Sequence, residues 1–327
     1  MDEFALIAQY FARAPRRAAL GVGDDAALWP LDGQRALAIT SDMLLQGRHF
    51  LPDTDPERLG HKALAVNLSD LAAMGARPCG YTLALALPEV NEAWLAAFAR
   101  GLHRLADAHG CELVGGDTTR GPCTLALTAW GEVPTAEALR RDGGRAGDDL
   151  WVSGELGLAA LGLALQQGSP DSPLLASQAT LDATTQARAI DAHETPVPRV
   201  ALGLALRGVA SAAMDISDGL SSDLLHLTRA SGVGAQVWVD RLPGHAALAA
   251  LPVAQRRALQ LAGGDDYELL FAAPAQQRPR VAQLAQTLGL TLTRIGRLTP
   301  LPTVQWLDHA QQPLTEVPCG FNHFAPS

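Results

Sequence analysis

The chain has 327 residues, 48% of them hydrophobic and 18% charged, so it is long enough for about two domains with their own cores and is no mini-protein or disulfide scaffold. Its formal net charge of −9 at pH 7 gives no positive field for a nucleic-acid backbone or an anionic membrane surface, and we expect neither as a partner. The basic residues are 24 Arg and one Lys, Lys62, so a phosphate site must use arginine, metal ions or that single ammonium.

The cysteines and the N-terminus predict a cytoplasmic protein with reduced thiols. The four cysteines form no C-x-x-C pair and no dense disulfide pattern. Acidic residues follow Met1 where a secretion signal needs basic ones. The longest apolar run, Leu156 to Leu165, is far below the ~20 residues that span a bilayer. We therefore expect neither secretion nor membrane insertion.

Strand-like and helix-like patterns alternate along the chain, which predicts an α/β or mixed α+β architecture. After Asn91, a typical N-cap, apolar residues recur at helical spacing until Gly110, a typical helix end. The first part of the chain is predicted to contain, in order, a strand at Ala36–Thr40, a helix at Pro56–Met74, a strand at Tyr81–Leu87, the helix between Asn91 and Gly110, and strands at Cys111–Val114 and Thr124–Val133.

The segment from Pro134 to Asp149 combines proline, glycine and charge, as connections between domains do. We place an N-terminal domain at residues 1–137 and a C-terminal domain at residues 148–327. The second domain is predicted to contain strands at Leu150–Ser153, Ala212–Ile216, Gln236–Asp240, Glu268–Ala273 and Leu292–Arg297, and helices at Glu155–Gln167, around Thr180–Ala192 and at about Ser221–Ala230.

Acidic residues gather in glycine-bounded clusters where strands or turns are expected to end. Residues at the carboxyl ends of strands meet in one crevice of an open sheet, so we expect Asp42, Asp117 and Asp215 to converge. A turn or a helix cap is an equally good interpretation of any one of these aspartates taken alone. The clusters together favour a shared site; their acidic residues are Asp24, Asp25, Asp42, Asp70, Asp117, Asp215, Asp218, Asp265, Asp266 and Glu268.

Converging carboxylates need a counter-charge, because two of them ~4 Å apart repel by roughly 4 kcal/mol at an effective dielectric constant near 20. Oxygen ligands without a histidine–cysteine set favour Mg²⁺, which shares its coordination shell between carboxylates and substrate phosphates. Walker, Rossmann, protein-kinase, G-x-S-x-G and H-E-x-x-H motifs are absent from the sequence. Metal-assisted phosphoryl transfer from a nucleoside triphosphate is therefore the chemistry that the pattern favours.

Six ordered motifs resemble those of the thiamine-monophosphate kinases, in the superfamily that includes aminoimidazole ribonucleotide synthetase and selenophosphate synthetase. The resemblance covers nearly the full length, and the six motifs together are far more specific than any one. They are Gly21-Val-Gly-Asp-Asp-Ala-Ala-Leu28, Ser41-Asp42 with Gly47-Arg-His49-Phe50, Lys62-Ala-Leu-Ala-Val-Asn-Leu-Ser-Asp-Leu-Ala-Ala-Met-Gly-Ala76, Gly115-Gly-Asp-Thr-Thr-Arg-Gly121, Asp215-Ile-Ser-Asp-Gly-Leu220 and Gly263-Gly-Asp-Asp-Tyr-Glu-Leu269.

The resemblance implies an N-terminal α/β domain for metal binding, ATP binding and dimerisation, whose half-barrel sheet joins that of a second subunit in a homodimer. It implies a C-terminal α+β domain that completes the ATP and substrate cleft. The implied reaction converts ATP and thiamine monophosphate into ADP and thiamine diphosphate, by direct in-line transfer with several Mg²⁺ ions, no phosphoenzyme and no catalytic base.

The resemblance also implies roles for individual residues. The implied metal ligands are Asp25, Thr40, Ser41, Asp42, Asp70, Asp117, Asp215 and Asp218. The implied ATP contacts are Gly116, Asp117, Arg141 and Ser217, and the implied contacts to thiamine monophosphate are His49, Asp265 and Phe321. The sequence departs from the commoner family pattern at Ser41 (often Thr), at Asp265 (often Glu, one methylene longer) and at Phe321 (often Tyr or Trp), and we expect the chemistry to survive all three changes.

Two alternatives remain open at this point. Another ATP-dependent member of the superfamily would use the same metal cluster on a different acceptor; a selenophosphate synthetase would carry a reactive Cys or selenocysteine and a Lys near its N-terminus, whereas the first Cys here is Cys79. The second alternative is a catalytically silent protein that binds a nucleotide or thiamine phosphate, with the acidic loops as solvated turns.

Overall fold

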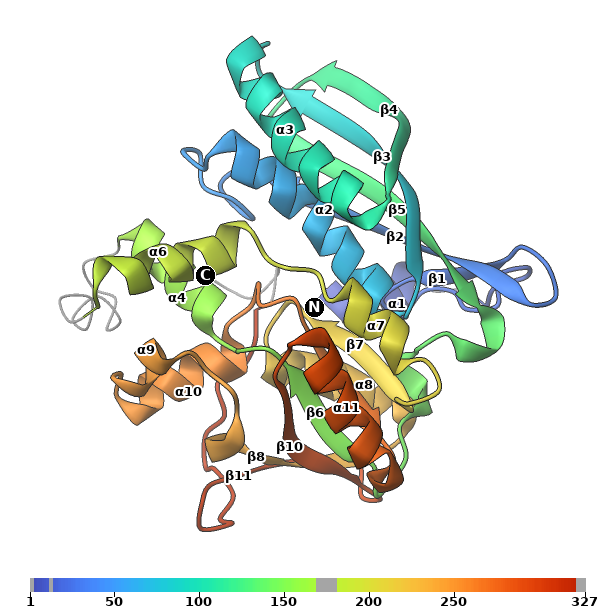
Figure 1. The fold of residues 1–327 in the computed structure, drawn as a ribbon, viewed down its shortest axis with the longest axis vertical. Coiled ribbons are helices and arrows are strands. Elements are labelled where there is room, and N and C mark those ends of the chain that lie inside the picture. The colour runs from blue at the N-terminus through green and yellow to red at the C-terminus, as the bar shows by residue number, and fades with distance from the viewer. Residues whose placement is uncertain (1–2, 12–13, 169–180, 322–327) are drawn as a thin grey trace.

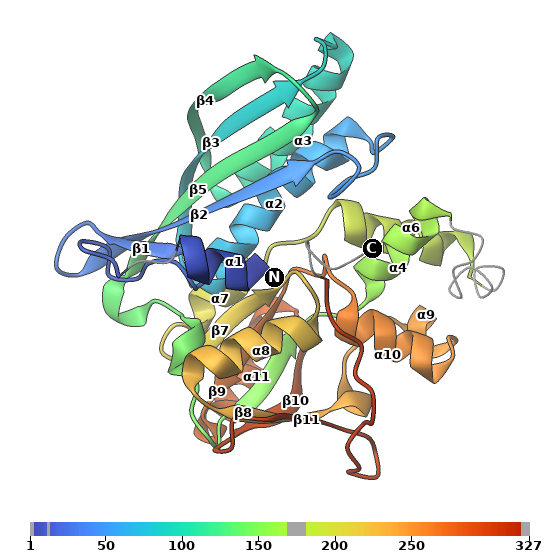
Figure 2. The ribbon, with the colours of Figure 1, turned by 180° about the vertical axis from the view of Figure 1, so that it is seen from behind.

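A computed structural model of the protein describes residues 3–11, 14–168 and 181–321, which form two mixed α/β bodies, each around one β-sheet (Figures 1 and 2). The first sheet contains β1 (Ala27–Pro30), β2 (Arg35–Leu45), β3 (Arg77–Leu87), β4 (Glu112–Arg120) and β5 (Thr124–Pro134). The second contains β6 (Asp149–Ser153), β7 (Ala212–Ile216), β8 (Gly234–Trp238), β9 (Glu268–Ala273), β10 (Leu292–Thr299) and β11 (Val304–Leu307).

The helices agree with most of the sequence predictions. A helix expected from Glu155 begins at Leu158 because Gly157 before it has the left-handed φ of 85°. Asp182 caps the helix expected around 180–192, whose predicted first residue lies outside the described residues. The pattern missed five helices, α1, α7, α9, α10 and α11, and two strands, β1 and β11. The helices are α1 (Glu3–Tyr10), α2 (Pro56–Ala73), α3 (Glu92–His109), α4 (Leu158–Gln167), α6 (Ala183–Glu194), α7 (Val200–Leu206), α8 (Leu220–Ser231), α9 (Ala246–Ala249), α10 (Val253–Ala262) and α11 (Arg278–Leu288).

The first sheet has the strand order β1-β2-β5-β3-β4, antiparallel except for the parallel pair of β3 and β4. Helices α2 and α3 lie on one of its faces, and Figure 2 shows the other face without a covering helix. The sheet has open edges at β4 and at the second half of β2. In the described part of the chain β4 pairs only with β3, and β1 pairs with only the first half of β2, Ala36–Ile39. Residues 40–45 of β2 therefore have a strand neighbour on one side only.

Two of the acidic motifs lie inside strands, not at strand ends, which corrects the sequence prediction for them. The strand expected to stop at Thr40 continues to Leu45, so Ser41 and Asp42 are strand residues. The strand expected to stop at Val114 continues through Gly116 and Asp117 to Arg120. Polar residues and glycines suggested breaks, but backbone pairing with β5 and with β3 overrides that local preference.

The second sheet, ordered β11-β8-β10-β6-β9-β7, is antiparallel except for the pair of β11 and β8. Helices α8 and α11 lie on its opposite faces (Figures 1 and 2). Strands β7 and β9 are buried along their whole length, so the residues that follow β7 and precede β9 are held by a fixed frame. No helix among the described residues is long and apolar enough to cross a membrane, and all four cysteines are unpaired.

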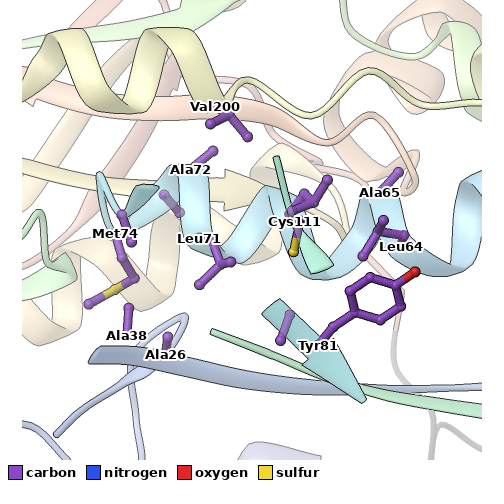
Figure 3. Packing of buried hydrophobic residues seen from close by; sticks show 14 of the residues in the cluster. Ala26, Ala38, Leu64, Ala65, Leu71, Ala72, Met74, Tyr81, Cys111 and Val200 are labelled. Carbon is purple, nitrogen blue, oxygen red and sulfur yellow. The ribbon is translucent and has the colours of Figure 1, made fainter. Parts of the chain in front are cut away.

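Helix α2 is buried on nearly all sides and joins the two bodies. Asp55 caps it by accepting a hydrogen bond from the Arg58 backbone N–H at 3.0 Å. Leu71 and Met74 at its C-terminal end face Ala38 of the first sheet, while Ala72 faces Val200 of α7 (Figure 3). Because the helix is buried on nearly all sides, the polar residues that it carries need partners or a function.

Two glycines let α2 and α3 approach closely. A Cβ on Gly60 would lie 2.0 Å from the Phe98 carbonyl oxygen, and one on Gly101 would lie 1.7 Å from the Glu57 carbonyl oxygen. Backbone atoms cannot yield as a flexible side chain does. The spacing of the two helices, and with it the position of α2 against the sheet, therefore depends on these glycines.

The glycine contact yields a stability prediction. In an open helical position, replacing glycine by alanine stabilises by about 1 kcal/mol. Gly101→Ala is expected to do the opposite and lower the free energy of unfolding by about 1–3 kcal/mol, because the new methyl group meets backbone. Urea unfolding measures this. Gly33→Ala, which meets nothing within 4 Å, is the control. A midpoint for Gly101→Ala at or above that of the unsubstituted protein would contradict the packing argument.

Candidate active site

Three carboxylates from three distant segments meet below the first sheet. Asp25 lies just before β1, Asp70 on α2, and Asp215 within β7 of the second sheet. One oxygen of each lies within 4.8 Å of the others. The sequence predicted that Asp215 would converge with Asp42 and Asp117, whereas the carboxylates that it meets here are those of Asp25 and Asp70.

Hydrogen bonds orient these carboxylates. The Thr40 hydroxyl donates to Asp70 Oδ2 at 2.5 Å, and the Ser69 hydroxyl donates to Asp215 Oδ2 at 2.6 Å. The Arg141 guanidinium donates to both oxygens of Asp25, at 2.6 Å and 3.1 Å. The single positive charge of Arg141 thus cannot neutralise the negative charge of all three carboxylates.

Burial, together with the excess of negative charge, raises the pKa values of carboxyl groups at the site. Burial, followed by repulsion from Asp42, Asp215 and Asp25, raises the pKa of Asp70 well above its ordinary value. Burial and then Asp25 do the same for the pKa of Asp215. Burial raises the pKa of Asp42 to about 6, and burial together with Asp25 raises that of Asp24 to about 7.

The donor set fits magnesium. Asp42 Oδ2 is buried and has no hydrogen-bond partner in the described part of the chain, so this oxygen could bind a cation. The other donors are carboxylate and hydroxyl oxygens, the ligand type that Mg²⁺ prefers. A divalent cation would satisfy the orphaned oxygen of Asp42 and offset the repulsion that raises the pKa of Asp70.

A cavity of about 940 Å³ opens beside this acidic cluster and is lined from both bodies. Its wall includes residues of β2, α2, α4, the segment after β7, the loop before β9, and the C-terminal segment. It collects seven of the predicted site residues from positions far apart in the sequence, namely Ser41, Asp42, His49, Ser217, Asp218, Asp265 and Phe321.

The three residues predicted to contact the acceptor lie in this one cavity. His49 Nδ1 accepts a hydrogen bond from the Leu45 backbone N–H at 3.0 Å, which fixes the ring at the end of β2. The Arg48 guanidinium lies 4.7 Å from the centre of the Phe321 ring. The Phe321 backbone N–H donates to the Asp218 carbonyl oxygen at 2.9 Å, so the C-terminal segment is attached to the start of α8.

Asp265 has an ion-pair contact with Lys62, a close contact with His193 and a hydrogen bond from Tyr267. Its carboxylate lies 3.3 Å from Lys62 Nζ of α2 and 3.4 Å from His193 Nε2 of α6, and it accepts from the Tyr267 hydroxyl at 3.1 Å. Although burial opposes ionisation, Lys62 and His193 outweigh it and lower the pKa of Asp265. Asp265 is therefore ionised throughout the neutral range.

Two predicted residues lie away from the acidic cluster within this chain. Gly116 and Asp117 sit on the exposed edge strand β4, three strand spacings or roughly 14 Å across the sheet from β2. Gly116 is required there for a structural reason, since a Cβ would lie 1.8 Å from the Leu83 carbonyl oxygen. The convergence expected of Asp117 with Asp42 is not made within one chain.

Several residues without a predicted role also shape the site. Ser69 orients Asp215, and Asp223 accepts hydrogen bonds from the Asp218 and Gly219 backbone N–H groups at 3.3 Å and 3.1 Å. Neither residue carries a signal beyond its polarity. Lys62 does, because it is the only lysine of the chain and is followed by small and apolar residues in the motif that starts with it.

Comparison with known proteins places this fold and site in one class. Residues 23–133 match the family model "AIR synthase related protein, N-terminal domain", and residues 145–306 match "AIR synthase related protein, C-terminal domain". The chain is thus a two-domain AIR-synthase-related protein.

Individual relatives narrow the class. The chain is 45% identical to a thiamine-monophosphate kinase of Salmonella typhimurium, covering 99% of this chain and 98% of the relative. A crystal structure of thiamine-monophosphate kinase from Stenotrophomonas maltophilia is 48% identical, with a TM-score of 0.78 over 93% of this chain and 96% of that one. AaThiL complexed with AMPPCP and TMP has 28% identity and a TM-score of 0.82 over 99% and 97%. The chain belongs to the thiamine-monophosphate kinase family.

The raised pKa values give a pH prediction. The folded protein holds protons on Asp42, Asp70 and Asp215 at pH values where the unfolded chain has lost them. The contribution of these groups to stability therefore falls as pH rises above the unfolded value near 4; the loss runs through about pH 6 for Asp42, and the raised pKa values of Asp70 and Asp215 act in the same direction. A bound divalent cation removes that penalty. Added Mg²⁺ is therefore expected to raise Tm more at about pH 8 than at about pH 5.

Thermal unfolding with and without MgCl₂ at both pH values measures the effect. Asp70→Asn is expected to lose most of the rise in Tm at the higher pH. Asp53→Asn, on an exposed turn, is the matched control and should keep the rise. An equal Mg²⁺ effect in both variants would show that the ion acts elsewhere.

Proposed function

We propose that this protein catalyses ATP-dependent phosphorylation of thiamine monophosphate to thiamine diphosphate, by direct in-line transfer of the γ-phosphoryl group. It is a phosphotransferase with a phosphate group as acceptor. The observation that carries the proposal is the buried acidic cluster beside a cavity lined by His49, Asp265 and Phe321, in a chain of the thiamine-monophosphate kinase family. The solved complex of AaThiL with TMP and AMPPCP, an ATP analogue, supports the same pair of substrates.

The chain's own carboxylates and hydroxyls would hold several Mg²⁺ ions. The proposed ligands are Asp25, Thr40, Ser41, Asp42, Asp70, Asp117, Asp215 and Asp218. Bound there, Mg²⁺ supplies charge neutralisation for the phosphates of two anionic substrates. The support is the hard oxygen donor set, the three-carboxylate cluster and the unpartnered oxygen of Asp42.

The protein's part in the reaction is to bind and orient. An oxygen of the acceptor phosphate is already an anionic nucleophile at neutral pH, so no general base is required and none is assigned. His49, Asp265 and Phe321 position thiamine monophosphate. Gly116, Asp117, Arg141 and Ser217 are the proposed ATP contacts. The Arg141 guanidinium lies 2.6 Å from Asp25, so it stands beside the proposed metal ligands.

A homodimer would complete this site. Residues 40–45 of β2 and the whole of β4 each have a strand neighbour on one side only among the described strands. Both carry exposed apolar side chains, including Met43 (56% exposed) and Val114 (57%). Such edges invite pairing with another chain. A two-fold arrangement that sets β4 of each copy against β2 of the other would close both edges and bring Asp117 of the partner subunit beside Asp42.

The proposed domains are residues 1–137 and 148–327, supported by the family matches at 23–133 and 145–306. The first would bind metal and ATP and form the dimer, and the second would complete the cleft. We also propose that the protein acts in the cytoplasm, where ATP and the reaction's phosphorylated acceptor are available.

The decisive test is an assay of labelled γ-phosphate transfer from ATP to thiamine monophosphate. We expect thiamine diphosphate to form, EDTA to stop the reaction and added Mg²⁺ to restore it. An aminoimidazole ribonucleotide precursor in a parallel assay tests whether another acceptor of the superfamily is used. Transfer that proceeds unchanged in EDTA would rule out the metal-assisted mechanism, and ATP binding without any transfer would leave a silent binding protein.

Complementation between two inactive variants tests the shared site. Asp42→Asn and Asp117→Asn are each expected to reduce turnover by more than about 100-fold without unfolding the protein, because each removes a ligand charge and no core contact. Co-expression of the two should restore about a quarter of wild-type activity, since about half of the dimers are mixed and one of the two sites in each mixed dimer is intact.

The controls separate the two arrangements of the site. Each variant expressed alone should stay inactive. Sedimentation should show a dimer in every preparation. If both aspartates acted within one chain, every site in a mixed dimer would lack one of them, and no activity would return.

A further inference from the structure

Lys62 is the one ammonium of this protein and it is buried at the wall of the cavity. It lies on α2, is 2% exposed, and lines the cavity together with Val66 one turn further along the helix. The metal-ligand candidate Asp70 follows eight residues after Lys62 on the same helix, about 12 Å along its axis. Lys62 therefore occupies the acceptor side of the cavity, one helix face away from the acidic cluster.

The bonding capacity of Lys62 is largely unused. An ammonium carries three N–H donors and no acceptor. Among the described residues its ion-pair partner is Asp265, at 3.3 Å from Oδ1, and Nζ makes no hydrogen bond of good geometry. Asp265 in turn already serves His193 and Tyr267. A buried, charged donor with unmade hydrogen bonds destabilises the folded protein unless a ligand completes its shell.

The cavity and its proposed substrate leave one chemical class for that ligand. The rings of thiamine include a cationic thiazolium, which a lysine ammonium repels, whereas the acceptor's phosphate is anionic. Arg48, the other permanently charged cation in the cavity wall, lies over the Phe321 ring. A phosphate entering the cavity from this side therefore finds one buried cation, Lys62.

We propose that Lys62 is a phosphate-binding residue of the acceptor pocket, donating hydrogen bonds to the phosphate oxygens of thiamine monophosphate while its ion pair with Asp265 fixes the direction of Nζ. This inference rests on the proposed function, because it takes its acceptor from there. Charge-assisted hydrogen bonds of this kind raise affinity by about 10-fold to 100-fold.

A single lysine permits a direct test on the unsubstituted protein. Labelling with [¹³Cε]lysine gives one side-chain NMR signal from the chain. Thiamine monophosphate is expected to shift that signal, and unphosphorylated thiamine, which has the same rings, is expected to leave it nearly in place. A signal that moves equally with both compounds would mean that Lys62 acts only by positioning Asp265, and a signal that moves with neither would mean that it faces no ligand; both results overturn the proposal.

Variants provide the second measurement. Calorimetric titration of Lys62→Met, an uncharged side chain of similar length, is expected to show a dissociation constant for thiamine monophosphate raised by about 10-fold or more, with that for thiamine changed by less than about 2-fold. Lys62→Arg should recover part of the loss. Asp265→Asn is the matched comparison, because it removes the partner and keeps the ammonium. Equal losses for both ligands in Lys62→Met would overturn the proposal.

The outcome is separable from that of the proposed function. The transfer assay on the wild-type protein decides whether thiamine monophosphate is phosphorylated at all. An active wild type whose Lys62 signal ignores the phosphate overturns the role of Lys62 alone.

Discussion

Mutual repulsion among buried carboxylates is the constraint on which this structure depends. Asp25 lies in the loop before β1 of the first sheet, Asp70 on α2, and Asp215 in β7 of the second sheet. One oxygen of each lies within 4.8 Å of the others. A protein core does not hold such a group for stability, because apolar residues of similar volume would serve better there. The arrangement is consistent with the proposed binding of divalent cations together with a phosphorylated substrate. Arg141, the cation that this chain supplies beside Asp25, offsets only part of the negative charge.

Helix α2 is where the two substrate requirements meet. Its small and apolar residues pack against both sheets. At Gly60 and Gly101 its contact with α3 leaves no room for even one methyl group, which fixes its position. Asp70 at one level belongs to the acidic cluster, and Lys62 at another belongs to the acceptor cavity. Asp70 and Lys62 lie about two helical turns apart on one buried helix, so the helix fixes the spacing between the proposed metal ligand and the proposed phosphate-binding ammonium. Positioning of this kind is what a transfer without a general base needs from its enzyme.

The sequence was enough for most elements and for the family, and the reasons for its failures are physical. The caps at Asn91 and Gly110 are local interactions, so α3 was predicted to within one residue. Strands β2 and β4 were cut short because Ser41, Gly115 and Gly116 have poor strand propensity, whereas pairing with a neighbouring strand decides their conformation. That Asp117 lies on an open edge, far from Asp42, depends on strand order, which no local pattern encodes. The cluster of six motifs indicated a site, but not which side of it each motif would form.

The loop before β9 shows why the acceptor side cannot drift relative to the metal side. Asp265 and Tyr267 both adopt positive φ, 65° and 49°, which costs of order 1–3 kcal/mol at each non-glycine residue. Glycine would relieve the strain, but it would remove the carboxylate that holds Lys62 and the hydroxyl that donates to Asp265. Their backbone N–H groups donate to the Ser217 and Ile216 carbonyl oxygens, both at 2.8 Å, immediately after Asp215 in the chain. The strained loop thus ties the acceptor pocket directly to the strand that carries a metal-ligand candidate, so the distance between the two sites is set by two backbone hydrogen bonds and a buried strand, not by flexible side chains.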